Sequence, residues 1–281
     1  MYRIGFDVGG TKIKVVVIDQ HGGTVFEQTN LTPMNPNGIY TCISLMYQQA
    51  STSIDFAEHT IGIGIPGNSA RPTYLLDGDI EKEFAARFLR PVKIENDANC
   101  FTLAEAHLGA GYKASSVFGV IIGTGVGGGI VINGQLYRGH SGLAGEWGHT
   151  PLYHDGLLCW CGQQGCVEQY LSGRAIEKKY RRNTNPYHLD VTAKEIFETK
   201  DLVNFAIVHE FYQDLAQGLA NIINYYDPEV IVLGGSLSKV KEIYDVVPTM
   251  VENLIFNSSL KTRIVENELG ADAGAIGAAL L

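Results

Sequence analysis

The sequence lacks several features that would assign it to a membrane, secreted or nucleic-acid-binding class. No apolar run approaches the roughly 18 residues of a membrane-spanning helix. The first residues, MYRIGFDVGGTKIK, have neither the apolar stretch nor the small-residue cleavage site of a signal peptide. The 21 lysines and arginines are scattered, and the formal net charge is −9. We therefore expect a cytoplasmic protein that binds neither nucleic acid nor a membrane surface.

Cysteine is also scarce, with five in 281 residues. A cytoplasmic protein keeps its thiols reduced, so disulfides are not expected. Three of the five nevertheless lie in CWCGQQGC (159–166) and follow a histidine. One imidazole and three thiolates form a tetrahedral ligand set for a structural Zn²⁺. The predicted ligands are His149, Cys159, Cys161 and Cys166, and the alternative is a group of reduced thiols without metal.

Proline-rich linkers and low-complexity segments are absent, and the chain reads as alternating strands and helices. Residues 4–19 and 118–132 share one pattern of strand, Gly/Thr-rich turn and strand. This repeat predicts two related α/β domains that face each other across a cleft. We expect an N-terminal domain of residues 1–113, with residues 270–281 packing back on it. Residues 114–269 then form a C-terminal domain that contains the zinc loop.

Strands are predicted over residues 2–6, 12–19, 60–65, 92–95, 117–123, 128–134 and 230–236. Helices are predicted from about residue 98, over 203–226, where apolar residues recur at helical spacing, and over 272–281.

Two glycine-rich turns, DVGGTK (7–12) and GTGVGGG (123–129), allow the backbone to approach a ligand closely. Successive backbone N–H groups in such turns can point at phosphate oxygens. Neither turn is a Walker A loop, because GK[ST] is absent. Asp7, beside the first turn, could bind Mg²⁺ through water. The alternatives are two hairpins without a ligand and a turn-capping Asp7.

Acidic and amide side chains gather near the ends of predicted elements. Asn96 and Asp97 follow a strand and begin a helix, where Asp97 could accept a proton from an attacking hydroxyl or serve only as a helix cap. Glu146 and Glu168 flank the cysteine loop, and the alternative for each is a solvated surface acid. If zinc fixes the two glutamates, the four side chains form a polar cage suited to a sugar.

Seven motifs run in one order through nearly the whole chain, namely DVGGTK, GIGIPG, ENDANC, IIGTGVGGGIVING, GEWGH, CWCGQQGCVE and DPEVIVLGG. In this combination the sequence resembles the bacterial sugar kinases of the ROK family (repressor, open reading frame, kinase). The resemblance implies an α/β protein with the actin-like, hexokinase/Hsp70-type two-domain fold and an interdomain cleft. It also implies a homodimer and ATP-dependent phosphorylation of a hexose or N-acetylhexosamine, at the 6-hydroxyl.

The resemblance also implies residue roles. Asp97 matches the catalytic base and, with Asn96, Glu146, His149 and Glu168, the sugar-binding positions. His149 would bind zinc with one ring nitrogen and a sugar hydroxyl with the other, and Asp7 matches the acid associated with Mg²⁺. The ATP-binding positions are Gly9, Gly10, Thr11 and Lys12 in the first phosphate loop, Gly123, Thr124 and Gly125 in the second, and Gly234 and Gly235 in the adenosine motif.

Residues 68–93 depart from the family pattern, because this segment is several residues shorter and lacks an Asn- and Trp-containing stretch that helps to enclose the sugar. The motifs resemble those of N-acetylglucosamine kinases and of fructokinases or mannokinases, so the sugar stays open among N-acetylglucosamine, fructose or mannose, and glucose. Two other functions are considered. A sugar-responsive repressor would need an N-terminal helix-turn-helix, for which the first strand leaves no room. A catalytically inactive sugar-binding sensor is the second.

Overall fold

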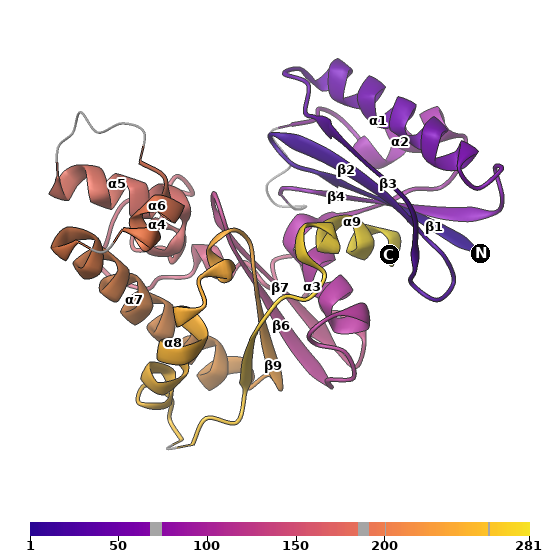
Figure 1. Cartoon of the computed structure of the whole chain (residues 1–281). Helices are drawn as coiled ribbons and strands as arrows, with labels where there is room; N and C mark the ends of the chain where they lie inside the picture. The colour runs from indigo at the N-terminus through magenta and orange to yellow at the C-terminus, as the bar shows by residue number, and fades with distance from the viewer. Residues whose placement is uncertain (68–74, 185–190, 200, 258) are drawn as a thin grey trace. The chain divides into compact units, whose positions relative to one another are not determined.

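The computed structural model describes residues 1–67, 75–184, 191–199, 201–257 and 259–281. Its strands form two five-stranded sheets (Figure 1). The first sheet has the order β3-β2-β1-β4-β5, with β1 Tyr2–Val8, β2 Lys12–Ile18, β3 Thr24–Leu31, β4 His59–Ile65 and β5 Lys93–Asn96. The second has the order β10-β9-β6-β7-β8, with β6 Ser116–Ile122, β7 Val126–Ile132, β8 Gln135–Leu136, β9 Val230–Gly234 and β10 Arg263–Glu266.

The two sheets share one topology. In the first, β1 is antiparallel to β2 and parallel to β4. In the second, β6 and β10 are each parallel to β9, and β7 is antiparallel to β8. The repeated pattern of residues 4–19 and 118–132 corresponds to the pairs β1–β2 and β6–β7. The structure thus confirms the repeat, and every strand predicted from the sequence is present.

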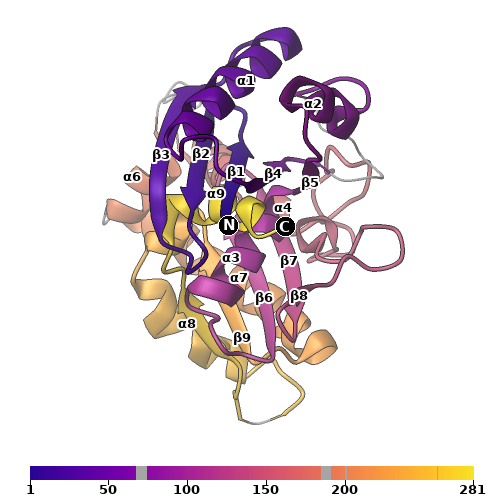
Figure 2. The same cartoon turned by 90° about the vertical axis from the view of Figure 1, so that its right-hand side faces the viewer.

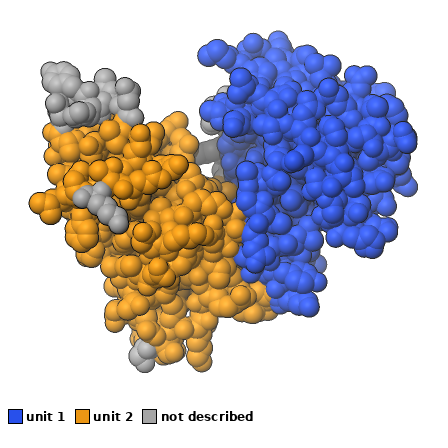
Figure 3. Space-filling model, in the orientation of Figure 1, with its two compact units in different colours: residues 1–113, 129–144, 268–281 blue, residues 114–128, 145–267 orange. Residues whose placement is uncertain are grey.

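The chain divides into two compact units (Figure 3). Unit 1 comprises residues 1–113, 129–144 and 268–281, and unit 2 comprises residues 114–128 and 145–267. Unit 1 is therefore assembled from three stretches of chain. One of them, 129–144, belongs to the C-terminal domain in the sequence analysis.

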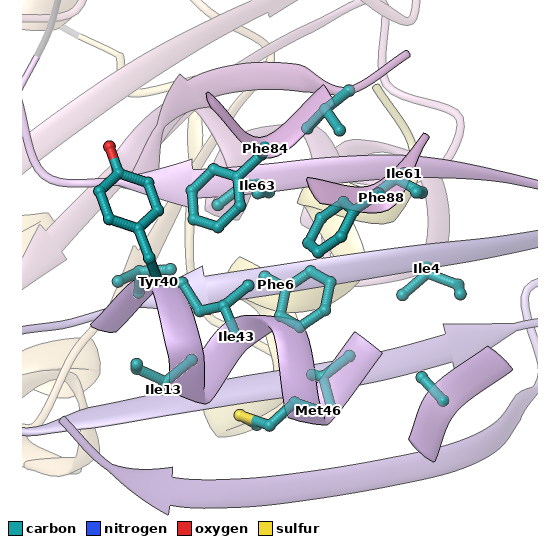
Figure 4. Packing of buried hydrophobic residues seen from close by; sticks show 14 of the residues in the cluster. Ile4, Phe6, Ile13, Tyr40, Ile43, Met46, Ile61, Ile63, Phe84 and Phe88 are labelled. Atoms are coloured by element: carbon teal, nitrogen blue, oxygen red, sulfur yellow. The ribbon is translucent and has the colours of Figure 1, made fainter. Parts of the chain in front are cut away.

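Helices cover both faces of the first sheet (Figures 1 and 2). α1 Pro36–Thr52 and α2 Ile80–Phe88 lie on one face, and α3 Asp97–Leu108 and α9 Ala273–Ala279 lie on the other. Figure 4 shows the apolar core under α1 and α2, where the rings of Tyr40 and Phe84 lie 4.9 Å apart. Of the shortened segment 68–93, residues 68–74 lie outside the described residues, and α2 lies within the rest.

Small residues allow α9 to approach its neighbours at backbone distance. A Cβ atom on Gly277 would lie 1.7 Å from the carbonyl oxygen of Cys100 in α3. A Cβ atom on Gly5 in β1 would lie 2.0 Å from the carbonyl oxygen of Ala275. Neither position can hold a side chain without displacing α9. The predicted small-residue helix near the end of the chain is confirmed, and its composition is what lets it pack so closely.

Unit 2 places most of its helices around α7 Leu202–Tyr226. Its other helical elements are η1 Trp147–His149, α4 Glu168–Leu171, α5 Gly173–Asn183, α6 Ala193–Glu198, η2 Leu237–Lys239 and α8 Glu242–Glu252. The helix predicted over 203–226 is confirmed, and the side that it buries carries the periodic apolar residues Phe211, Leu215, Leu219 and Ile222. Among the described residues, no helix combines the length and hydrophobicity needed to span a membrane.

Candidate functional site

The start of α3 presents a carboxylate at the positive end of a helix. The helix cap is Asn96, whose side-chain oxygen accepts hydrogen bonds from the backbone N–H groups of Ala98 at 2.9 Å and Asn99 at 3.1 Å. Asp97 is the first residue of the helix, so the expectation that it could be only a cap is replaced by a cap at Asn96. Negative charge is favoured at this end of a helix.

Both the oxygen and the nitrogen of the Asn96 side-chain amide form hydrogen bonds. Its amide nitrogen donates to the carbonyl oxygen of Gly67 at 3.1 Å, in the GIPG turn that follows β4. Glu95 holds the same region from the other side, since it accepts from Asn99 and pairs with Arg138. The position of Asp97 is therefore fixed by three neighbouring segments of unit 1.

Asp7 lies near Asp97 at the end of β1. Burial and the negative charge of Asp97 raise the pKa of the Asp7 carboxyl to about 7, and the charge of Lys14 acts in the opposite direction. A Cβ atom on Gly274 would lie 2.7 Å from a carboxylate oxygen of Asp7, so the glycine in α9 makes room for it. A cation bound beside Asp7 would restore the ionised carboxylate.

The first glycine loop forms the tip of the β1–β2 hairpin. The N–H group of Gly9 donates to the carbonyl oxygen of Lys12 at 2.9 Å, and Thr32 donates its hydroxyl to the carbonyl oxygen of Gly9 at 2.7 Å. Gly10, Thr11 and Lys12 are exposed. Hydrogen bonds at Gly9 therefore fix the backbone at the base of the loop, while residues 10–12 at its tip stay accessible to a ligand.

The other two proposed nucleotide elements belong to unit 2. Between β6 and β7 the N–H group of Gly123 donates to the carbonyl oxygen of Gly125 at 3.0 Å, which closes a tight turn around Thr124. Gly234 ends β9, and Gly235 follows with φ of +88°. A Cβ atom on Gly235 would lie 2.4 Å from the carbonyl oxygen of Ile122, so this turn requires glycine next to the 123–125 turn.

The four predicted metal ligands come together in unit 2. The ligand atoms of His149, Cys159, Cys161 and Cys166 all lie within 4.8 Å of one another. The sulfur atoms of Cys161 and Cys166 are 3.6 Å apart, and the sulfur of Cys159 is 3.6 Å from Nδ1 of His149. In a tetrahedral zinc site with Zn–S bonds of about 2.3 Å, two sulfurs lie about 3.8 Å apart. The donor set therefore fits Zn²⁺ in both chemistry and spacing.

Without a cation, the surroundings of Cys159 and Cys166 favour the neutral thiol. Burial and the two neighbouring cysteines raise the pKa of Cys166 to about 12, and burial also raises the pKa of Cys159. A bound divalent ion displaces the thiol protons and compensates the charge of the thiolates. The side-chain amide of Gln169, 3.6 Å from the sulfur of Cys159, adds a donor from outside the ligand set.

The cysteine loop is folded tightly around this cluster. Gly165 has φ of +72°, and a Cβ atom there would lie 1.6 Å from the carbonyl oxygen of Tyr153. The hydroxyl of Tyr153 hydrogen-bonds the buried carboxylate of Asp214 in α7. Beside the loop, the indole N–H of Trp147 donates to the carbonyl oxygen of Gly218 at 3.3 Å. The cluster is thus anchored on the longest helix of unit 2.

The two predicted glutamates stand at the two ends of the loop. Glu146 precedes η1, the turn that carries His149. Glu168 begins α4, and its carboxylate accepts hydrogen bonds from the indole N–H of Trp160 at 2.5 Å and from the backbone N–H of Val126 at 3.1 Å. Neither Trp160 nor Val126 is predicted as a site residue from the sequence. The only signal for Trp160 is its place between two metal ligands.

The fold has close structural neighbours. A ROK-family glucokinase from Streptomyces griseus, solved in complex with glucose and AMPPNP, matches with a TM-score of 0.84 and 30% identity and covers 99% of this chain and 98% of its own. A ROK hexokinase from Thermus thermophilus matches with a TM-score of 0.87 and 31% identity, over 100% and 97% of the two chains. The two like sheets and these neighbours define the actin-like hexokinase fold.

Sequence relatives identify the protein family. An N-acetyl-D-glucosamine kinase from Pectobacterium carotovorum is 36% identical over 297 residues, which cover 99% of this chain and 97% of that protein. A glucokinase from Streptomyces coelicolor is 33% identical over 305 residues, with 98% and 96% covered. The sequence profile of the ROK family matches residues 3–281. The chain belongs to the ROK family.

Proposed function

We propose that the protein is an ATP-dependent kinase that transfers the γ-phosphoryl group of ATP to a hydroxyl group of a hexose or N-acetylhexosamine. The observation that carries the proposal is the match of nearly the whole chain to named sugar kinases, together with the position of Asp97 at the start of α3. The relatives favour N-acetylglucosamine and glucose as the first sugars to test. Fructose and mannose follow from the motif wording, and the 6-hydroxyl is the expected acceptor.

Asp97 is the general base of the proposed reaction. Its carboxylate accepts the proton of the sugar hydroxyl as the oxygen attacks the γ-phosphorus atom in line, and the bond to the β-phosphate oxygen breaks. Asn96 supports this role, since it caps the same helix and ties it to the GIPG turn. In unit 2 the sugar ligands are Glu146, His149 and Glu168.

Backbone N–H groups stabilise the transferring phosphoryl group in this proposal. The first donors are Gly9, Gly10 and Thr11 with the charge of Lys12, and the second are Gly123, Thr124 and Gly125. Gly234 and Gly235 allow the adenosine to approach the end of β9. Asp7 would hold Mg²⁺ through water, and Mg²⁺ supplies charge neutralisation of the ATP phosphates when it is bound.

Zinc would be held by His149, Cys159, Cys161 and Cys166, with no ligand position left for substrate. Its contribution is structural. His149 faces the cluster through Nδ1, which leaves Nε2 as the nitrogen for a sugar hydroxyl. The metal would also fix the loop between Glu146 and Glu168, so that both carboxylates keep one geometry.

A coupled assay of ADP release tests the proposal with N-acetylglucosamine, N-acetylmannosamine, glucose, mannose, fructose and allose. We expect turnover with at least one sugar, and ³¹P NMR should identify the product as a 6-phosphate. Sugar binding by calorimetry without any ADP release would favour the alternative, a catalytically inactive sensor. If no sugar of the panel is bound and none is turned over, both functions are contradicted.

A further inference from the structure

Glu168 joins two segments that the sequence separates. One carboxylate oxygen accepts from Trp160 in the cysteine loop, and the other accepts from the backbone of Val126, directly after the second glycine turn. A Cβ atom on Gly125 would lie 2.8 Å from the latter oxygen. At the other end of the turn, the carbonyl oxygen of Gly123 accepts from the N–H group of Gly173 at 2.8 Å.

These contacts bind the segment from α4 to α5 to both ends of the 123–126 turn. The carboxylate of Glu168 is therefore a bridge between the metal loop and the proposed phosphate loop. If the carboxylate of Glu168 moves, the N–H group of Val126 at the end of the proposed phosphate loop has to move with it or lose its acceptor. Charge-assisted hydrogen bonds of this kind are about twice as strong as neutral ones.

Trp160 holds the other end of this bridge. Its side chain is 67% exposed, which is unusual for the largest apolar residue. Its ring meets the ring of His149 edge-on, with centroids 4.9 Å apart and an interplanar angle of 87°. One indole thus contacts both His149 and Glu168. An exposed tryptophan with two such contacts is held by them rather than by a hydrophobic core.

We propose that Trp160 is a positioning residue of the kinase, which acts through Glu168 on sugar and ATP binding together. This inference rests on the proposed function. The indole N–H fixes one carboxylate oxygen, the backbone of Val126 fixes the other, and the remaining lone pairs of Glu168 stay available to sugar hydroxyls. Loss of the indole frees the carboxylate of Glu168 to rotate. The carboxylate is then no longer fixed for the sugar contact, and its hydrogen bond to the 123–126 turn is weakened.

The test compares Trp160→Phe with Leu158→Ala. Leu158 is an equally exposed apolar side chain in the same loop, at 70% exposure. Trp160→Phe keeps an aromatic ring but removes the donor to Glu168. Because a hydrogen bond to a charged group is lost, we expect a rise of about tenfold in the sugar KM. We also expect a rise of about threefold in the ATP KM. Zinc content should stay at the parental value, and Leu158→Ala should keep both KM values.

A double-mutant cycle shows whether Trp160 acts through Glu168. In the Glu168→Ala background, which has no side-chain acceptor for the indole, Trp160→Phe should change the sugar Kd, measured by calorimetry, by less than about twofold. The full tenfold effect in that background would overturn the proposal. Zinc loss from Trp160→Phe would overturn it as well, since the residue would then support the metal site.

Fluorescence gives an independent readout, because the chain has two tryptophans and Trp147 is buried. Glucose, N-acetylglucosamine and a non-hydrolysable ATP analogue should each change the emission of the parent protein, and the change should vanish in Trp160→Phe. Unchanged KM values in Trp160→Phe, with an active parent, would overturn the inference and leave the proposed function standing. An inactive parent would overturn both.

Discussion

Replacement of Glu105 should loosen the C-terminal segment of the chain. Glu105 lies in α3 and is fully buried. Its carboxylate accepts three backbone N–H groups, from Ala110 at 2.9 Å, Glu268 at 3.1 Å and Leu269 at 2.9 Å. The last two precede the turn that leads into α9. One side chain therefore ties the helix that begins with Asp97 to the helix that packs under β1.

The magnitude follows from these three bonds. Glu105→Gln keeps one carbonyl oxygen but turns an NH₂ group towards a backbone donor, which should cost about 2 kcal/mol of the free energy of unfolding. Glu105→Ala leaves three buried donors without partners and should cost about 4 kcal/mol. Exposed Glu58 offers a control, and Glu58→Gln should change the free energy of unfolding by less than about 0.5 kcal/mol.

Urea denaturation followed by far-UV circular dichroism measures these differences. Hydrogen–deuterium exchange locates them, because residues 268–281 should exchange faster in Glu105→Ala while α7 in unit 2 keeps its protection. Glu105→Ala with a loss below about 1 kcal/mol, or with unchanged exchange over 268–281, would refute the reasoning.

Three further predictions concern metal, pH and assembly. Metal analysis should find one zinc per chain, and Cys161→Ala should lose the zinc and most activity while circular dichroism stays near that of the parent; zinc-free protein with full activity would contradict this. Without Mg²⁺ and ATP, Asp7 keeps its proton in the folded state up to about pH 7, whereas the unfolded chain loses it above the ordinary pKa of 3.8. The free energy of unfolding should therefore fall as pH rises through that window, by at most about 1.4 kcal/mol per pH unit. Asp7→Asn should flatten the slope, and an unchanged slope would reject the assignment. Light scattering should give twice the 30.6 kDa chain mass, whereas a mass near that of one chain would rule out the homodimer.

The sequence predicts the strands and their repeat well, because buried apolar runs such as those of β1, β6 and β9 each end at a glycine turn. It also predicts the metal cluster, since all four ligands lie within a short stretch whose glycines let it close. The cap of α3 is less certain from sequence. Asn96 and Asp97 are both good caps, and only the backbone conformation decides for Asn96.

Contacts between distant segments could not be predicted from one sequence. The bond between Glu168 and Val126 spans 42 residues, and those between Glu105 and residues 268–269 span more than 160. No local pattern of residue spacing in the sequence predicts either of these contacts. In the sequence, the metal loop and the 123–125 turn are separate motifs, whereas in the structure Glu168 and Gly173 bind one to the other. Loss of zinc should consequently alter ATP affinity as well as sugar affinity.

Comparison of Asp97→Asn with the parent tests the central claim most directly, with Asp245→Asn, at an exposed position of α8, as the matched control. The amide keeps the shape of the side chain but cannot accept the hydroxyl proton. The account predicts a loss of about 10²–10⁴ in kcat for Asp97→Asn, with sugar still bound in calorimetry, and parental kcat for Asp245→Asn. Turnover by Asp97→Asn within tenfold of the parental rate would contradict the role of Asp97 as the base.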